Sequence, residues 1–234
     1  MRPHVDENKF AGPEHLNPSY VAGYDSKAKT DPSPDVQRLR DFGLTAESVV
    51  VDMGAGTGTF ATAVAPLCKK VIAVDVSPAM IATLEEKISK LGRTNVEVVE
   101  AGFLSFEAVP SSIDFVYSRN ALHQLPDHLK EIAVRRISKM LKPLGVFHLK
   151  DLVYSFPKEE ADKYFKAWLD AAPTDPKEGY TREDLETHIK TEFSTYSDEL
   201  EAMLDQAGFV IREFDHSANK IFSVYTCIKK LSSS

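Results

Sequence analysis

Three glycines follow an acidic residue at the end of an apolar run. Asp52 is succeeded by Gly54, Gly56 and Gly58, after the valines at 49–51. Glycines let a backbone turn tightly and bring its N–H groups near a ligand, and the N-terminus of the following helix attracts the same polar groups. The aspartate adds an acceptor at the end of the strand. This pattern predicts a nucleotide-type binding site where a first strand passes into a first helix.

The spacing of these glycines narrows the choice of ligand. A dinucleotide fingerprint needs glycine or alanine at position 59, where this chain has Thr59. The order is instead an acid followed by Gly-x-Gly-x-Gly, so a pyrophosphate site for NAD is disfavoured. A glycine turn without a ligand is the alternative, at a cost of about 0.5–1 kcal/mol per glycine that the backbone does not need.

A second acid, Asp75, ends the next apolar run, 71–74. It comes about one helix and one strand after the glycine turn, which is where an acid accepts hydrogen bonds from the two hydroxyls of a ribose. The alternative is that Asp75 only caps the helix that begins at Pro78.

These residues lie in an alternation of short apolar runs and helical patterns. The predicted strands are 49–51, 71–74, 96–99, 113–117 and 146–149, and the predicted helices between them are 57–67, 78–91 and 127–141. Apolar strands separated by helices are typical of an α/β fold with a doubly wound, mostly parallel sheet. The runs 209–214 and 221–228 predict an antiparallel hairpin that brings this sheet to seven strands.

The chain divides into four predicted parts. Residues 1–35 form an irregular N-terminal arm, 36–150 a Rossmann-like core, 151–196 a helical substrate cap, and 197–234 a helix and hairpin that complete the sheet. The segment 151–196 is far longer than a connection between neighbouring elements needs to be, and long connections are usually functional. Its eight aromatic residues suit a flat or apolar substrate, but core packing is the more common use of such residues.

The composition excludes several classes of partner. The 234 residues contain 28 Lys and Arg against 35 Asp and Glu, a formal charge of −7. This disfavours nucleic acid and anionic membranes, which bind clustered basic residues. Only two cysteines are present, the histidines lack metal-ligand spacing, and neither a signal peptide nor a membrane-spanning run is evident. We therefore expect a cytoplasmic protein with no metal site, no nucleic-acid partner and no membrane insertion.

The motifs together resemble the class I S-adenosylmethionine-dependent methyltransferases. Residues 52–58 are similar to the first motif of that family, Asp75 to its ribose acid, 119–127 to its segment after the fourth strand, and 141–146 to its turn before the fifth. The likeness covers 36–150 closely, and 197–229 fits the reversed final strand of the family. It is nearest to the small-molecule methyltransferases of ubiquinone and menaquinone biosynthesis.

The resemblance implies a cofactor, S-adenosylmethionine, with S-adenosylhomocysteine as product. Asp52 and the backbone of 54–58 would hold the methionine part, and Asp75 the ribose. Val76 and Met80 would flank the adenine. Gly102 occupies the position where relatives often have an acid for the adenine amino group, so adenine would be read by the N–H of Phe103 and by packing. In the arm, Tyr20 and Tyr24 would close over the cofactor, with plain packing as the alternative.

Methyl transfer requires a positioned nucleophile, removal of its proton where necessary, and exclusion of water. His123 is the candidate general base because imidazole titrates near neutrality; capping a turn or contacting the cofactor is an equal alternative. Arg119 would steer an anionic substrate group or pair with Asp151.

The predicted function is methyl transfer to a small-molecule acceptor. The alternatives are a non-catalytic S-adenosylmethionine-binding regulator or scaffold and, less favoured, a nicotinamide-dependent oxidoreductase. Neither the acceptor nor the oligomeric state follows from the sequence.

Overall fold

The computed structural model describes residues 6–231, so the first five residues of the predicted arm lie outside it. One sheet runs through the molecule in the order β3-β2-β1-β4-β5-β8-β7, and the short β6 pairs with β5. The strands are β1 (Val49–Met53), β2 (Lys70–Asp75), β3 (Val96–Glu100), β4 (Ile113–Arg119), β5 (Leu141–Tyr154), β6 (Thr195–Tyr196), β7 (Phe209–His216) and β8 (Phe222–Lys229).

The α-helices precede β1 and then lie between successive strands along most of the chain. They are α1 (Pro18–Val21), α2 (Tyr24–Ala28), α3 (Ser33–Asp41), α4 (Thr59–Val64), α5 (Pro78–Lys90), α6 (Asp127–Met140), α7 (Ala161–Asp170), α8 (Arg182–Thr191) and α9 (Ser197–Gln206). The short 3-10 turns are η1 (Glu7–Phe10), η2 (Pro13–Leu16), η3 (Ala65–Leu67), η4 (Leu122–Gln124) and η5 (Lys158–Glu160).

The predicted doubly wound sheet is confirmed. Strands β1 to β5 are parallel, with Val50 opposite both Val71 and Phe115, and β8 runs antiparallel to β5 and β7. Because the chain turns outward in opposite directions from β1, the carboxyl ends of β1 and β4 form a topological switch point, the usual place for a ligand in such sheets.

Two predicted boundaries differ from the structure. The turn predicted at 142–145 lies inside β5, as an irregularity that shifts the β4–β5 register between Ile113 and Phe115. Strand β5 also continues to Tyr154 because β8 pairs along it as far as Leu152, an antiparallel contact that local periodicity does not reveal. The short strand β6 was not predicted.

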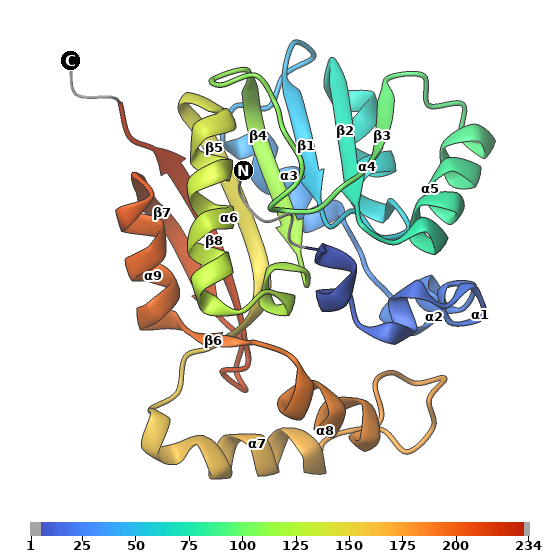
Figure 1. Cartoon of the computed structure of the whole chain (residues 1–234), viewed down its shortest axis with the longest axis vertical. Helices are drawn as coiled ribbons and strands as arrows, with labels where there is room; N and C mark the ends of the chain where they lie inside the picture. Colours follow the sequence, from blue (N-terminus) through green and yellow to red (C-terminus); the bar gives the residue numbers. More distant parts are fainter. Residues whose placement is uncertain (1–5, 232–234) are drawn as a thin grey trace.

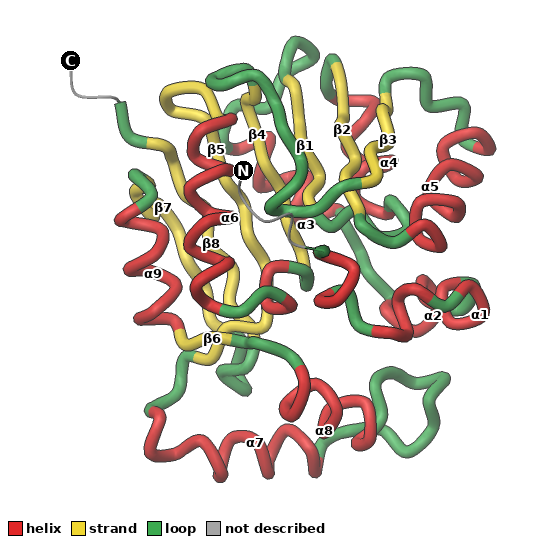
Figure 2. The backbone as a smooth tube through the Cα atoms, viewed as in Figure 1, coloured by secondary structure: helices red, strands yellow, loops and turns green. Residues whose placement is uncertain are grey.

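Helices cover both faces of the sheet, as Figures 1 and 2 show. On one face, Leu39 of α3, Phe60 of α4 and Leu84 of α5 pack on the strands. On the other, Ile137 of α6 and Leu204 of α9 do so. Side chains alternate between the two faces along a strand, so Val50 of β1 lies in one core and Val51 in the other.

The arm and the cap lie at the same end of the sheet. Figure 1 shows α7 and α8 below the sheet, on the side where α1 and α2 also lie. Helix α8 begins with a capping box, in which Thr181 and Asp184 satisfy each other's backbone N–H groups. Within residues 6–231, no helix is long and apolar enough to cross a membrane.

Candidate functional site

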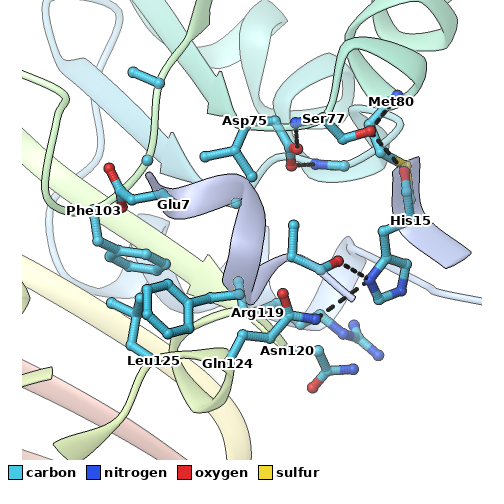
Figure 3. Close-up of a pocket in the computed structure, with 18 of the residues that line it drawn as sticks. Glu7, His15, Asp75, Ser77, Met80, Phe103, Arg119, Asn120, Gln124 and Leu125 are labelled. Atoms are coloured by element: carbon cyan, nitrogen blue, oxygen red, sulfur yellow. Dashed lines mark hydrogen bonds between the residues drawn. The ribbon is translucent and has the colours of Figure 1, made fainter. Parts of the chain in front are cut away.

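A cavity opens at the carboxyl ends of the central strands. Its wall joins the glycine turn after β1, the ends of β2 and β3, the segment after β4, and the N-terminal arm. Figure 3 shows several of these side chains, with Glu7 beside Phe103 and with Arg119 close to Asn120. The predicted residues on this wall are Gly54, Gly56, Tyr24, Asp75, Val76, Met80, Gly102, Phe103 and Arg119.

The glycine turn brings backbone N–H groups to the cavity. Gly56 has a φ of +53°, and a Cβ built on it would meet no atom of the described chain within 4 Å. Its N–H donates to Asp75 Oδ2 at 2.8 Å. Gly58, with a φ of +77°, is the N-cap of α4. The open space beside Gly56 is therefore the place where a ligand can approach the backbone.

Asp75 is held in place by two backbone donors. Besides Gly56, the N–H of Ser77 donates to Asp75 Oδ1 at 2.9 Å. Burial raises the pKa of this carboxyl above its usual value. Helix α5 is capped by Ser77, whose Oγ accepts from the N–H of Met80, so the alternative that Asp75 caps this helix is wrong.

Asp52 is buried beside a second pocket, which adjoins the cavity and shares Gly54, Gly56 and Arg119 with it. Among the described residues its Oδ2 atom has no hydrogen-bond partner. Burial, together with the nearby Asp75, raises the pKa of Asp52 to about 8. An unpaired buried acceptor costs about 1–3 kcal/mol, so Asp52 is suited to receive a donor from a ligand.

Glu7 is a cavity residue that the sequence did not reveal. Its carboxylate accepts from the N–H of Leu104 at 2.9 Å and from Ser105 Oγ at 2.6 Å. A Cβ on Gly102 would lie 2.3 Å from Glu7 Oε2, so the glycine makes room for this carboxylate. No local signal marks Glu7, because its partners are far along the chain and its own surroundings are polar.

The arm covers the cavity through aromatic and charged contacts. Tyr24 lines the cavity, whereas Tyr20 packs behind it, with ring centroids 6.4 Å apart. Asp25 accepts from Thr57 in the glycine turn and pairs with Lys87 at 2.7 Å. Lys27 pairs with Asp184 of the cap at 3.0 Å. These contacts connect the arm to the core and to the cap.

Arg119 faces the cavity but does not pair with Asp151. Its nearest carboxylate is Asp35, whose Oδ2 lies 3.5 Å from Nη1 and also accepts from the hydroxyl of Tyr117 at 2.8 Å. Asp151 is occupied by His123 instead, which corrects the predicted alternative. The guanidinium thus keeps donors available on the cavity side.

His123 lies outside the set of described residues that line the cavity. Its Nδ1 pairs with Asp151, and its Nε2 lies 2.7 Å from Glu192 Oε2. Burial alone would lower the pKa of His123, but the two carboxylates raise it to about 9. Its role as a general base stays a prediction, and both of its ring nitrogens are engaged by carboxylates in the structure.

The predicted absence of a metal site rested on the spacing of histidines along the chain. The fold brings His188 and Glu192 of the cap to His123, with His188 Nδ1 2.6 Å from Glu192 Oε2. Such a grouping cannot be found from local spacing, because His123 belongs to the core and the other two residues belong to the cap.

The comparisons with known proteins identify the family. A family model described as a methyltransferase domain matches residues 50–145. An uncharacterised methyltransferase of Bacillus subtilis, YrrT, is 31% identical over 163 residues, which cover 70% of each chain. This chain belongs to the class I S-adenosylmethionine-dependent methyltransferases.

Solved structures agree with this methyltransferase fold. An S-adenosylmethionine-dependent methyltransferase of Aquifex aeolicus has a TM-score of 0.60 at 22% identity, over 91% of this chain and 98% of that one. Phosphoethanolamine N-methyltransferase 2 of Haemonchus contortus, in complex with S-adenosylmethionine, has a TM-score of 0.71 at 16% identity. The alignment covers 98% of this chain and 61% of the Haemonchus protein. The likeness to the ubiquinone and menaquinone enzymes stays a prediction.

Most aromatic residues of this methyltransferase's cap are core. Tyr154 and Phe156 are buried, and Tyr164, Trp168 and Tyr196 pack against them as a separate cluster. Phe193 is 42% exposed and contacts Phe10 of the arm. Tyr180 alone of the eight lines the site, at the pocket beside Asp52. Of the aromatic surface that the sequence suggested for a flat or apolar substrate, only the ring of Tyr180 therefore lies at the site.

Proposed function

We propose that this methyltransferase transfers the methyl group of S-adenosylmethionine to a small molecule bound beside Arg119. The observation that carries the proposal is the buried Oδ2 atom of Asp52, which has no hydrogen-bond partner among residues 6–231. Asp52 lines one of two adjoining pockets, Asp75 lines the other, and Gly56 lines both. Polar groups in this arrangement fit a ligand with hydroxyl and amino donors.

The residues present suit each part of the cofactor. We assign Asp75 and Gly56 to the ribose, and Asp52 and Gly54 to the methionine end, because these residues line the two adjoining pockets. For the adenine, Val76, Met80 and Phe103 offer apolar contacts, with Glu7 beside them as an acceptor. When bound, the cofactor supplies a sulfonium methyl group that is activated for displacement.

A small acceptor is supported by the closure of the cavity. The arm crosses it from Glu7 to Tyr24, and the Lys27–Asp184 pair joins the arm to the cap. A folded protein or a nucleic-acid strand would require the arm to move away. A small molecule needs only a side opening.

Arg119 is proposed to bind an anionic group of the acceptor. The guanidinium presents a planar set of donors that suits carboxylate and phosphate, and its single contact with Asp35 is long, at 3.5 Å. Tyr180 and Asn120 border the same end of the cavity. Since His123 lies behind the wall, we assign it no proton transfer, and the chain's contribution is positioning and exclusion of water.

The first test is a thermal-shift series with S-adenosylmethionine, S-adenosylhomocysteine and NAD. A ligand at 100 times its dissociation constant adds about 2.7 kcal/mol to the free energy of unfolding, so both adenosyl compounds should raise the melting temperature, whereas NAD should not. Stabilisation by NAD alone would reject the assignment.

The Asp75→Ala variant should bind S-adenosylhomocysteine about 30-fold more weakly, because about 2 kcal/mol of ribose hydrogen bonding is lost. Calorimetry measures this, with the exposed Asp205→Ala as the matched control. Unchanged affinity in Asp75→Ala would contradict the ribose assignment.

Turnover is tested by release of S-adenosylhomocysteine against a panel of small carboxylates, phosphate esters, amines and phenols. Acceptor-dependent release that falls in Arg119→Met is the expected result. Tight cofactor binding without turnover on any acceptor would favour the non-catalytic alternative.

A further inference from the structure

A buried group of side chains joins the cap to the core beside the cavity. His123 belongs to η4, after β4, whereas His188 lies in α8 and Glu192 directly follows that helix. We propose that these three residues form a zinc site that fixes the cap to the core. This site goes beyond the proposed methyl transfer and depends on none of its steps.

The first argument is convergence of ligand atoms. His123 Nε2, His188 Nδ1 and an oxygen of Glu192 all lie within 4.8 Å of one another. The same oxygen, Oε2, lies 2.7 Å from His123 Nε2 and 2.6 Å from His188 Nδ1. A zinc ion needs donors about 2.0–2.1 Å from its centre, so a small outward shift of Glu192 makes room for it.

The second argument is the state of the outer ring nitrogens. His123 Nδ1 pairs with Asp151 Oδ1, and His188 Nε2 lies 2.9 Å from Ser194 Oγ. Asp151 is itself held by the N–H groups of His123 at 3.1 Å and Leu152 at 2.8 Å. Metal-binding histidines characteristically use the far nitrogen in this way, which orients the ring and leaves the near nitrogen for the metal.

The donor set selects the class of metal. Two imidazoles and one carboxylate suit Zn²⁺ with a fourth position open, whereas Mg²⁺ and Ca²⁺ prefer oxygen donors. The site is enclosed, with His123 5% and His188 8% exposed and the Trp168 ring 5.6 Å from that of His188. The cluster carries two carboxylates, Asp151 and Glu192, that offset the charge of the ion.

The position of the cluster indicates what the ion would do. The N–H of Phe193 donates to the carbonyl of His123 at 3.0 Å, so the cap loop already lies against η4. Gln124, the next residue in η4, lines the cavity. An ion bound here would hold the cap against the strand-four segment without touching the reacting atoms.

The test is a zinc titration of chelator-treated, full-length protein in competition with a chromophoric chelator. Wild type should bind one Zn²⁺, and both His188→Ala and Glu192→Gln should weaken binding by about 100-fold or more. The exposed His128→Ala is the matched control and should bind as wild type does. Equal zinc affinity in wild type and His188→Ala would overturn the proposal and leave a hydrogen-bonded cluster only.

A second measurement separates ligand loss from misfolding. Cobalt(II) in the site should give the visible absorption of a four-coordinate ion in wild type and in His128→Ala, but not in His188→Ala. Each variant is checked for stabilisation by S-adenosylhomocysteine, which reports an intact core. Absence of metal binding with that stabilisation intact rejects only the zinc site, whereas zinc binding without it rejects only the proposed function.

Discussion

Three carboxylates at the cavity are stabilised in different ways. Glu7 has donors on both oxygens, and Asp75 likewise accepts one backbone N–H on each. Asp52 Oδ2 has none among the described residues. Since a buried acceptor without a partner is costly, the three residues are expected to respond differently to pH and to ligand.

The free energy of unfolding should depend on pH through Asp52. Its pKa is about 8 in the native state, against an ordinary value of 3.8 in the unfolded chain. The native state thus binds the proton more tightly, and this stabilisation, complete below about pH 3.8, is lost as pH rises towards 8. Asp52→Asn removes this titration. The melting temperature of the variant, measured relative to that of wild type, should therefore rise between about pH 3.8 and 8 and stay constant above pH 8.

Thermal unfolding at several pH values between about 4.5 and 8.5 measures that difference. Asp205→Asn, an exposed aspartate, provides the control and should show a constant offset from wild type. A pH-independent offset for Asp52→Asn would show that the buried carboxyl titrates normally.

The Glu7→Gln variant should weaken binding of S-adenosylhomocysteine while leaving NAD without effect. The amide keeps the size of the side chain but loses the negative charge next to Phe103, and hydrogen bonds to a charged group contribute about 1.5–3 kcal/mol. Calorimetric titration gives the affinity, with the exposed Glu107→Gln as control. If both variants bind equally well, Glu7 only anchors the arm.

At the scale of elements, the glycine turn contains one glycine required for packing and another that faces the binding cavity. Gly56 and Gly58 both have positive φ, but a Cβ on Gly58 would lie 1.9 Å from Leu84 Cδ1 in the core, whereas Gly56 faces open space. An alanine would therefore have a strained backbone at either position, but it would clash with another side chain only at position 58.

Gly58→Ala should lower the melting temperature more than Gly56→Ala does, and Gly56→Ala should lose more cofactor affinity in relation to its stability. Gly92→Ala is a matched control, because Gly92 has a φ of +61° and open space but lies after α5, outside the cavity. Its free energy of unfolding should fall by about 1 kcal/mol, because alanine is strained at a left-handed φ, and its cofactor affinity should not change. Thermal unfolding and calorimetry on the three variants decide this, and equal losses of affinity in Gly56→Ala and Gly92→Ala would argue against ligand contact at the turn.

At the scale of the whole molecule, the cavity is built from segments distant in the sequence. The sheet supplies one wall, the arm supplies Glu7 and Tyr24, and the cap supplies Tyr180. The partly exposed Lys27–Asp184 ion pair connects arm and cap, and ion pairs that solvent reaches contribute less to stability than buried contacts do. The buried contacts of Glu7 and the cluster around Glu192 are therefore the stronger connections between these parts.

The sequence by itself determined the sheet, the glycine turn and the two strand-end aspartates. Hydrophobic periodicity is local, and a strand followed by glycines and a helix can adopt few conformations. Boundaries were least certain where a strand continued through antiparallel pairing, as β5 does beyond residue 149.

Only the tertiary structure decided which distant residues meet. Periodicity shows that a residue faces a core or solvent, but not which side chain it meets there. Glu7 beside Gly102, Arg119 beside Asp35, and His123 between Asp151 and Glu192 are all contacts of this kind. His123 shows the consequence most clearly, since its pKa and its access to the cavity depend on two carboxylates that the fold brings to it.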